Sequence, residues 1–468
     1  MNYMSTNLKL TNQLAHLPND VRITKYESHP AYCELFLSWP EDQDTKCPCC
    51  ESVNFIGKGR SSVKTVYHIP IGGAATYLTF SLQRYRCKDC GKYFTESPYW
   101  LHPYLKLSMD LYLSICASLQ SVTSIKQISE DLHIPEKTVT ATMNSVHFDH
   151  PISLPETLCI DEFKGDTGFW DQNKKRFITN KFHCNIADGD SGCVVDVLPR
   201  MDLQYLEKYI KQFSPAKRAR VKYFCTDLHG GFLTFAKKYF PNVFICVDMF
   251  HVVQLLNDNL HQIRRKIQND LQNKADDAKL KNDSGTCKYM TDQYNLLKSS
   301  SRLLLTAEAN QTDSWKRHME RNKRKLDVIF GLYPELKEAY DALQDFHRII
   351  RTPQYGAQRI MFSDFLDNYT SSEYESIRHV AYTLRRNRNY IQNTWKQNKS
   401  NAVCEGLNNR IKVLKRNAYG QHSFPNFRQR ILFACGYTQF VKDTYSIVSV
   451  RKTTDKSQKK GGKRKVRK

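Results

Sequence analysis

From residue 155 onward, short apolar runs alternate with amphipathic segments, a pattern that predicts strands alternating with helices. The predicted strands, in chain order, cover residues 158–163, 181–186, 193–198, 221–226 and 243–247. Residues 181–198 form a predicted hairpin, because a turn rich in glycine and aspartate joins the second strand to the third. Amphipathic helices are predicted over residues 203–213 and 231–239. We expect a mixed α/β fold, in which three meandering strands are followed by parallel crossovers.

The segment before this sheet carries two C-x-x-C pairs on either side of a strand-like stretch. Cys47 and Cys50 make the first pair, and Cys87 and Cys90 make the second. Each pair forms a tight turn that presents two thiolates, and two such turns complete a tetrahedral Zn²⁺ site. Residues 66–86 between the pairs alternate apolar and polar side chains, which predicts a hairpin and hence a zinc ribbon. Chance cysteines or a redox pair are the alternative.

A helix-turn-helix is predicted between the ribbon and the sheet. Residues 107–120 have a helical pattern, and a second helix ends near Leu132 before a short turn. A third helix begins near Pro135, with Val139 and Met143 as its buried anchors. The side chains expected to face a DNA groove or backbone are Lys137, Thr138, Thr140 and Asn144. A plain helical hairpin without a DNA contact is the alternative.

The sequence between residues 251 and 399 is helical and highly charged, and it contains no strand-like run. We expect an all-helical insertion there. The helix that follows has an apolar stripe made by Val403, Leu407, Ile411 and Leu414. Its second face carries Glu405, Asn409, Lys412 and Arg416, with Lys415 beside them. This second face begins with a candidate metal ligand and continues into basic residues suited to DNA phosphates.

The overall charge of the chain points to a polyanionic partner. The chain has 468 residues and a formal net charge of +23, which indicates nucleic acid, and its length suggests about three domains. No apolar run of about 18 residues is present, so no membrane span is expected. Residues 1–22 lack a signal-peptide core, so we expect a cytoplasmic protein with reduced cysteines. Residues 451–468 hold ten Lys or Arg against one acid, which predicts a disordered tail that binds phosphates, with a solvated tail of no specific role as the alternative.

Three carboxylates far apart in the sequence are the candidate catalytic groups. Asp161 and Asp227 each end a predicted strand, and Glu405 lies at the start of a helix. Buried acids cost free energy unless cations compensate them, and carboxylate oxygens are ligands that Mg²⁺ prefers. Two such ions stabilise the attacking and leaving oxygens of an in-line phosphoryl displacement. We prefer Asp227 to Asp248 as the second acid, and expect Asp248 and His251 to support the site.

With these residues assembled, the chain resembles the DDE transposases of bacterial insertion sequences, specifically the ISL-three group. The resemblance covers nearly the whole chain. It is carried by the two C-x-x-C pairs, the helix-turn-helix, and the motifs at residues 160–163, 226–227, 247–251 and 400–412, of which the last is the most specific. It implies an RNase H-like catalytic core with a helical insertion between Asp227 and Glu405. It also implies a site for two Mg²⁺ (or Mn²⁺) ions at Asp161, Asp227 and Glu405, supported by Asn409.

The same resemblance implies that the N-terminal modules bind the terminal inverted repeats of the element. We expect a homodimer, because two DNA ends must be held together. The predicted segments are a zinc-ribbon domain (1–100), a helix-turn-helix domain (101–150), the first part of the core (151–258), a helical insertion (259–398), the final core helices (399–445) and a basic tail (446–468). An acidic and aromatic loop at residues 165–180 has no assigned role.

The leading hypothesis is a transposase that cleaves at element ends and joins the 3′-hydroxyl to double-stranded target DNA. A DNA-binding protein that retains the fold without catalysis is the first alternative. A metal-dependent nuclease without strand transfer is the second, and it uses the same carboxylates.

Overall fold

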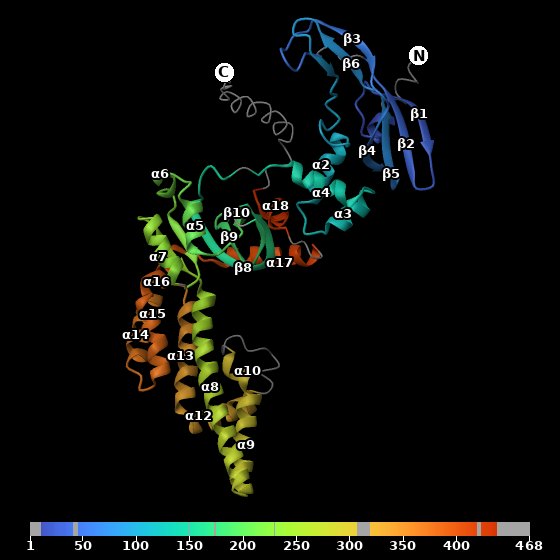
Figure 1. Ribbon diagram of the computed structural model, residues 1–468. Helices are drawn as coiled ribbons and strands as arrows, with labels where there is room; N and C mark the ends of the chain where they lie inside the picture. Colours follow the sequence, from blue (N-terminus) through green and yellow to red (C-terminus); the bar gives the residue numbers. More distant parts are fainter. Residues whose placement is uncertain are drawn as a thin grey trace, which may run out of the picture.

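The computed structural model describes residues 11–40, 45–148, 150–172, 175–228, 230–306, 319–418 and 423–437. Small sheets lie at one end of an elongated molecule, a larger sheet lies in the middle, and a long helical bundle extends to the other end (Figure 1). No helix in these segments is long and apolar enough to cross a membrane. The basic tail predicted at residues 446–468 lies outside the described residues.

Two small sheets form the N-terminal part. The first contains, in order, β1 (Arg22–Ser28), β2 (Tyr32–Ser38), β5 (Ala74–Phe80) and β4 (Lys64–Ile71), and the second contains β3 (Phe55–Arg60), β6 (Gln83–Cys87) and β7 (Tyr93–Thr95). The hairpin predicted within residues 66–86 is present as β4 and β5, but it pairs with β2 in the first sheet rather than with the strands beside the cysteines. Leu78 and Phe80 of β5 are buried with Leu35 and Leu37 of β2 in a separate small core.

The predicted helix-turn-helix is present as three short helices, α2 (Met109–Ser118), α3 (Ile125–Asp131) and α4 (Glu136–Ser145). Ser108 and Ser124 cap α2 and α3, since each hydroxyl accepts a hydrogen bond from a backbone N–H of the first turn. Val139 and Met143 are fully buried, as predicted, in a core shared by the three helices. The short turn between α3 and α4 is therefore fixed by apolar packing on both sides.

The central sheet has five strands in the order β10-β9-β8-β11-β12. Their bounds are β8 (Thr157–Asp171), β9 (Arg176–Asp188), β10 (Cys193–Leu198), β11 (Tyr223–Thr226) and β12 (Phe244–Val247). β8, β9 and β10 pair in antiparallel fashion, and β11 and β12 extend the sheet in parallel with β8. This confirms the predicted mixed α/β arrangement, which is that of an RNase H-like core.

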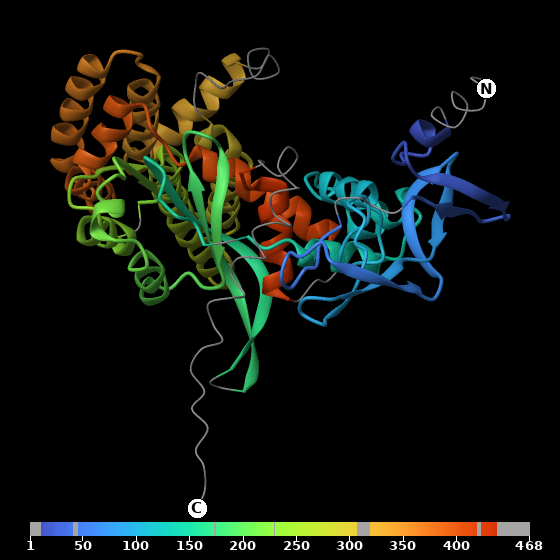
Figure 2. The same ribbon diagram turned by 90° about the horizontal axis from the view of Figure 1, so that it is seen from above.

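β8 and β9 continue far beyond the other strands as a two-stranded arm, seen in light green at the lower centre of Figure 2. The prediction of a loop at residues 165–180 is therefore wrong, because β8 runs to Asp171 and β9 begins at Arg176. Aromatic residues favour a pleated strand pair, and Trp170 stands directly opposite Phe177 in the arm. The aromatic residues of this segment favour strands, but the polar and charged residues between them favour a loop, which is why a loop was predicted.

Helices cover both faces of the central sheet. α5 (Leu203–Ile210), the short α6 (Pro215–Arg218) and α7 (Gly230–Tyr239) connect the strands, and α5 and α7 pack on one face in a core that continues into the helical bundle. α17 (Ala402–Asn417) and α18 (Phe424–Cys435) pack on the opposite face. Leu407, Ile411 and Leu414 are buried there, which confirms the predicted apolar stripe of α17.

The predicted helical insertion follows β12. Its helices are α8 (Met249–Leu280), α9 (Ser284–Ser299), α10 (Ser301–Leu305), α12 (Met319–Leu332), α13 (Pro334–Arg351), α14 (Tyr355–Thr370), α15 (Glu375–Arg386) and α16 (Arg388–Gln397). α16 returns to the sheet, where the Thr394 hydroxyl bonds both the N–H and the carbonyl of Val247, and Asn393 donates to the Ile245 carbonyl. These bonds cover the edge strand β12, which stops it from pairing with another chain.

Candidate active site

Three aspartates lie at one level of the sheet. Asp227 and Asp248 directly follow the ends of β11 and β12, whereas Asp161 lies inside β8, just beyond its pairing with β11, so the prediction that Asp161 ends its strand is wrong. The register aligns Cys159 with Cys225 and Cys225 with Cys246. Each of these cysteines is followed two residues later by an aspartate, and the three are Asp161, Asp227 and Asp248. The cysteines are buried in the core that α17 covers, so the acids lie directly above a row of small apolar side chains.

Asp227 and Asp248 share one histidine. His251 lies in the first turn of α8, and its Nδ1 is 3.0 Å from Oδ1 of Asp227 and 3.6 Å from Oδ2 of Asp248. Asp248 is also the N-cap of α8, since its Oδ1 accepts a 2.9 Å hydrogen bond from the Phe250 N–H. The nearby Asp248 carboxylate, together with the negative charge of Asp227, raises the pKa of His251. Asp248 therefore caps α8 and also lies beside Asp227, where it can support the site as expected.

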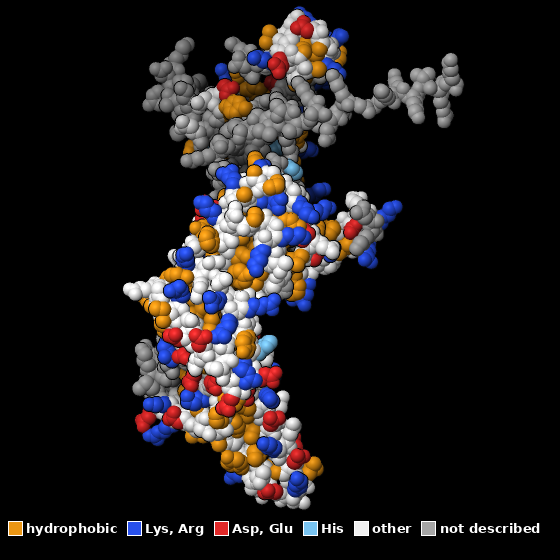
Figure 3. All heavy atoms as spheres, turned by 90° about the vertical axis from the view of Figure 1, so that its left-hand side faces the viewer, with side chains coloured by type: hydrophobic (Ala, Val, Ile, Leu, Met, Phe, Trp, Pro, Cys, Tyr) orange, Lys and Arg blue, Asp and Glu red, His pale blue; other side chains and the backbone are white. Residues whose placement is uncertain are grey.

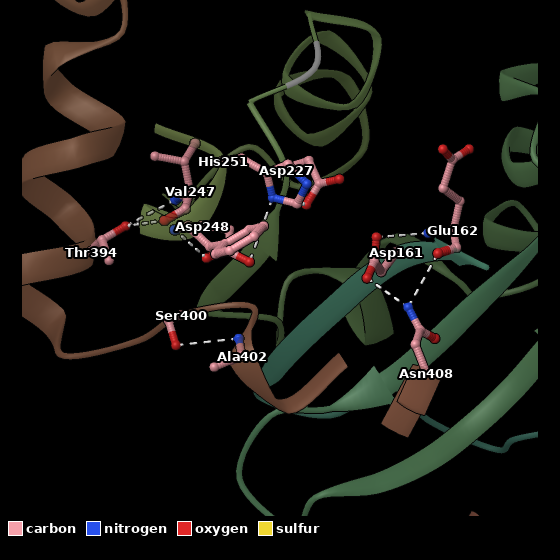
Figure 4. A network of polar contacts seen from close by, with 11 residues as sticks. Asp161, Glu162, Asp227, Val247, Asp248, His251, Thr394, Ser400, Ala402 and Asn408 are labelled. Carbon is pink, nitrogen blue, oxygen red and sulfur yellow. Dashed lines mark hydrogen bonds and ion pairs between the residues drawn. The ribbon is translucent and has the colours of Figure 1, made fainter. Parts of the chain in front are cut away.

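Asp161 is the acid whose ionisation is most unfavourable. Burial and the charge of Asp227 raise the pKa of Asp161 to about 7. Its Oδ2 accepts a 2.7 Å hydrogen bond from the Asn408 amide of α17, and its Oδ1 accepts a 2.8 Å bond from the Glu162 N–H (Figure 4). Asn408 is only 5% exposed and receives a 3.2 Å bond from Asn185 of β9. A chain of amides therefore fixes the orientation of this carboxylate.

The donor atoms of this cluster fit a divalent cation. One ligand atom each from Asp227, Asp248 and His251 lies within 4.8 Å of the other two. Oδ1 of Asp227 and Nδ1 of His251 are buried, yet despite their short separation neither has a hydrogen bond of good geometry among the described residues. Burial raises the pKa of Asp227 as well. Hard carboxylate oxygens suit Mg²⁺ and Mn²⁺, and a bound cation relieves the repulsion between the acids.

Glu405 and Asn409 occupy a different position from the aspartates. Glu405 is exposed in the first turn of α17, and in the described part of the chain it is not among the clustered ligand atoms. Asn409 is also exposed, and its Oδ1 accepts a 3.3 Å bond from Lys412. Asn408 contacts Asp161 instead, and it lies three residues after Glu405 on the same side of the helix. The amide that holds Asp161 is therefore Asn408, the neighbour of the predicted Asn409.

Sequence reasoning missed Asn408, although the chain carries a signal for it. Asn408 lies four residues after Cys404 and three before Ile411, within the apolar stripe of α17. A polar side chain in a buried stripe must find a polar partner, because an unpaired buried amide costs free energy. Its second partner, Asn185, lies in an apolar strand and offers the same kind of signal.

The predicted zinc ligands form a compact cluster at the tip of the second small sheet. Sγ of Cys47 is 3.6 Å from Sγ of Cys90, and Sγ of Cys50 is 3.6 Å from Sγ of Cys87. All four sulfur atoms lie within 4.8 Å of one another. A tetrahedron with zinc–sulfur distances of about 2.3 Å has sulfur–sulfur edges of about 3.8 Å. The four thiols thus have the spacing of a structural Zn²⁺ site.

The four residues predicted to face DNA from α4 are not equivalent. Lys137 and Asn144 are exposed, and Thr138 is partly exposed. Thr140 instead lines a groove of about 720 Å³ between α3–α4 and α17–α18. Lys137 and Asn144 are therefore the most open to solvent, whereas Thr138 and Thr140 are half-buried and Thr140 lies on the groove toward α17 and α18.

α17 and α18 hold the helix-turn-helix against the core. Residues 119–123 connect α2 to α3, and each of their five carbonyls accepts a hydrogen bond from a side chain of α17 or α18. Arg430 donates to the carbonyls of residues 119, 121 and 123, and it is 3% exposed. Arg410 and Asn417 donate to the other two. α17, which contacts Asp161 near its start, thus fixes the helix-turn-helix near its end.

The basic residues of α17 also divide into two groups. Lys412 and Arg416 are exposed. Lys415 forms a 2.5 Å ion pair with Asp166 and donates a 3.3 Å hydrogen bond to the Lys164 carbonyl of β8. Lys415 therefore anchors the base of the two-stranded arm, whereas the other two cations are available to a ligand.

Two family models match the chain. The model described as transposase, of the ISL3 type, matches residues 158–431, and the model described as the zinc-finger of transposases IS204, IS1001, IS1096 and IS1165 matches residues 43–90. The transposase for insertion sequence element IS1001 of Bordetella parapertussis is 20% identical over 402 residues, which are 82% of this chain and 90% of that protein. A Lactococcus lactis protein named ATP-dependent protease is 37% identical over 111 residues, and this match covers 24% of the chain and about a third (34%) of that relative's length.

Proposed function

This chain belongs to the ISL3 family of transposases, and we propose that it binds the terminal inverted repeats of an insertion sequence, cleaves the DNA at the element ends and joins the 3′-hydroxyl to target DNA. The observation that carries this proposal is the row formed by Asp161, Asp227 and Asp248, each two residues beyond one of the aligned cysteines of β8, β11 and β12. Burial raises the pKa of Asp161 and of Asp227, so their ionised forms are unfavourable until a cation binds.

We assign metal binding to Asp161, Asp227 and Glu405, with Asp248 and His251 in support. Two bound Mg²⁺ or Mn²⁺ ions would supply Lewis-acid stabilisation of the attacking and leaving oxygens of the phosphoryl transfer. Asn408 positions the Asp161 carboxylate through its 2.7 Å hydrogen bond. His251 holds Asp227 and Asp248 close together by an ion pair with each.

Glu405 completes the set from α17. It lies one helical turn before Asn408, which touches Asp161, and this spacing supports the assignment of its exposed carboxylate to the site. The exposed side chains of Asn409, Lys412 and Arg416 continue along α17, where they would contact DNA phosphates.

The N-terminal modules would supply recognition of the element ends. The zinc ribbon needs one structural Zn²⁺ at its four cysteines, and α4 would present Lys137, Thr138 and Asn144 to the DNA. The contacts of Arg430, with those of Arg410 and Asn417, keep this recognition helix at a fixed distance from the acids. A homodimer would bring two element ends together.

A strand-transfer assay tests the proposal. Purified protein is incubated with Mg²⁺ or Mn²⁺, a target plasmid and duplexes carrying the terminal repeats that flank its gene. We expect cleaved and joined products from the wild type, and neither from Asp161→Asn. Cleavage without joining would identify a nuclease, and tight binding without cleavage would identify a DNA-binding protein that has lost catalysis.

A further inference from the structure

The two-stranded arm, formed by residues 164–171 of β8 and 176–182 of β9 with the turn residues 172 and 175 at its tip, has no role in the site described above. It leaves the sheet beside the acids, since β11 pairs with β8 only as far as Cys159. It protrudes into solvent at the right-hand side of Figure 3. A shift in register between Lys164 and Thr167 separates the arm from the sheet. Lys415 of α17 anchors its base through Asp166 and the Lys164 carbonyl.

Large aromatic side chains lie exposed on this arm. Trp170 is 57% exposed, and Phe177, its direct partner on the other strand, is 50% exposed. Phe177 lies over Gly168, where a Cβ atom would come within 2.6 Å of the ring. The absence of a side chain at Gly168 therefore makes room for one side of the Phe177 ring, and the other side of the ring is exposed. Exposed aromatic residues on a protruding element indicate a binding surface rather than a core.

The charge around these rings complements a polyanion. Lys164, Lys175, Arg176 and Lys181 are all exposed on the arm. Asp166 is already paired with Lys415 and lies 3.9 Å from Lys164, which leaves little of its charge uncompensated. A two-stranded ribbon is narrow enough to enter the major groove of duplex DNA, and exposed lysine and arginine side chains contact the phosphates that flank a groove.

We propose that this arm is a DNA-contacting element, which binds the duplex about nine base pairs from the phosphate that is cleaved. Nine residues separate Asp161 from Trp170 along β8. At about 3.3 Å per residue this is about 30 Å, or about nine base pairs at 3.4 Å each. The inference rests on the proposed function for the place of cleavage. It adds a second, outlying contact between the catalytic core and DNA, independent of α4.

Two variants test this contact, each with a matched control. The first replaces both rings, Trp170→Ala with Phe177→Ala, and its control is Tyr382→Ala, since Tyr382 is a 55% exposed aromatic residue on α15 of the helical bundle. The second is Lys175→Gln with Arg176→Gln, and its control is Lys279→Gln with Lys281→Gln at the exposed end of α8. All are made in an Asp161→Asn background so that the DNA stays intact during binding.

The measurements are affinity, its salt dependence and hydroxyl-radical protection on a 40-base-pair duplex with the terminal repeat. We expect the ring variant to bind at least tenfold more weakly and to lose protection about nine base pairs from the cleavage position. The Lys175/Arg176 variant should lower the slope of log K against log salt by about two, because each phosphate contact contributes about 0.9. Duplexes shortened to end before that position should bind wild type and ring variant equally.

The result that overturns the proposal is unchanged DNA affinity and protection in both arm variants. If light scattering showed that the ring variant lost dimer mass while its DNA contacts were retained, the arm would be a contact between two copies of the chain, and the proposal would be wrong. Because binding is measured without cleavage, a failure of the strand-transfer assay leaves this test intact. The Lys175/Arg176 variant keeps the aromatic pair, so it still measures the DNA contact of the arm if the ring variant misfolds.

Discussion

The cysteine cluster and the aspartate row are two candidate metal sites that are built in opposite ways. The four thiols come from two short motifs, and their sulfur atoms already stand at the spacing of a closed tetrahedron. The acids come from separate strands, joined by amides and a histidine from α17 and α8. Burial raises the pKa of Asp161 and of Asp227, and a neighbouring acid adds to each shift, so the ionised acids are unfavourable without a cation. A closed site with four protein ligands stabilises the fold. A site of buried acids that needs cations to become favourable is suited to metal-dependent catalysis.

The largest effect should follow from breaking the closed site. Cys87→Ser removes one of four ligands, and structural Zn²⁺ in small domains contributes on the order of 10 kcal/mol of folding free energy. We expect loss of bound zinc, measured by atomic absorption, and unfolding of the β3-β6-β7 sheet, measured by protease digestion. Cys49→Ser is the matched control, because Cys49 is exposed and outside the cluster. If Cys87→Ser kept its zinc and its protease resistance, the closed-site account would be wrong.

Breaking the open site should abolish activity but preserve the fold. Asp161→Asn removes a negative charge whose burial is unfavourable, so the metal-free variant should melt at the same or a higher temperature than wild type. Strand transfer should fall at least about a thousandfold, the size of effect expected when a group that binds the catalytic metals is lost. Asp367→Asn, at a 72% exposed acid of α14, is the control and should retain both properties. A destabilised Asp161→Asn variant would show that this acid is structural.

The amides of α17 offer a sharper test of the open site. Asn408→Ala removes the hydrogen bond that orients Asp161 and should lower strand transfer about 10- to 100-fold, the usual cost of losing a residue that orients a metal ligand. Asn409→Ala, one residue away and exposed, is the matched control and should cost much less. Equal losses in the two variants would contradict the positioning role of Asn408.

The smallest effect is a pH dependence that the cysteine cluster should not share. Because the pKa of Asp161 is raised to about 7, a cation must displace a proton below that pH. Mg²⁺ affinity should therefore fall about tenfold per unit as the pH drops below 7 and level off above it. Without metal, the folding stability changes with pH in the opposite direction. It falls as the pH rises from about 4 through 7, because Asp161 ionises while buried. Thermal denaturation with and without Mg²⁺ measures both, and Asp161→Asn should flatten both trends.

The same contrast explains what could be predicted from the sequence. The cysteine spacing and the buried anchors Val139 and Met143 are local signals, and the structure contains what they predict. The succession of strands and helices along the chain also followed from local periodicity. The position of Asn408 could not be assigned in this way, because its partner is 247 residues away along the chain. The arm was missed for a different reason, since aromatic strand residues alternate there with acidic and basic ones.

The position of bound metal shows directly whether Asp161, Asp227 and Glu405 hold the catalytic ions. Crystals of the wild type with terminal-repeat DNA, soaked in Mn²⁺, would be measured at the manganese absorption edge. We expect anomalous peaks within bonding distance of the Asp161 and Asp227 carboxylates, with Glu405 brought to the same ions. Mn²⁺ bound elsewhere, with these carboxylates still protonated or paired only with His251, would contradict it.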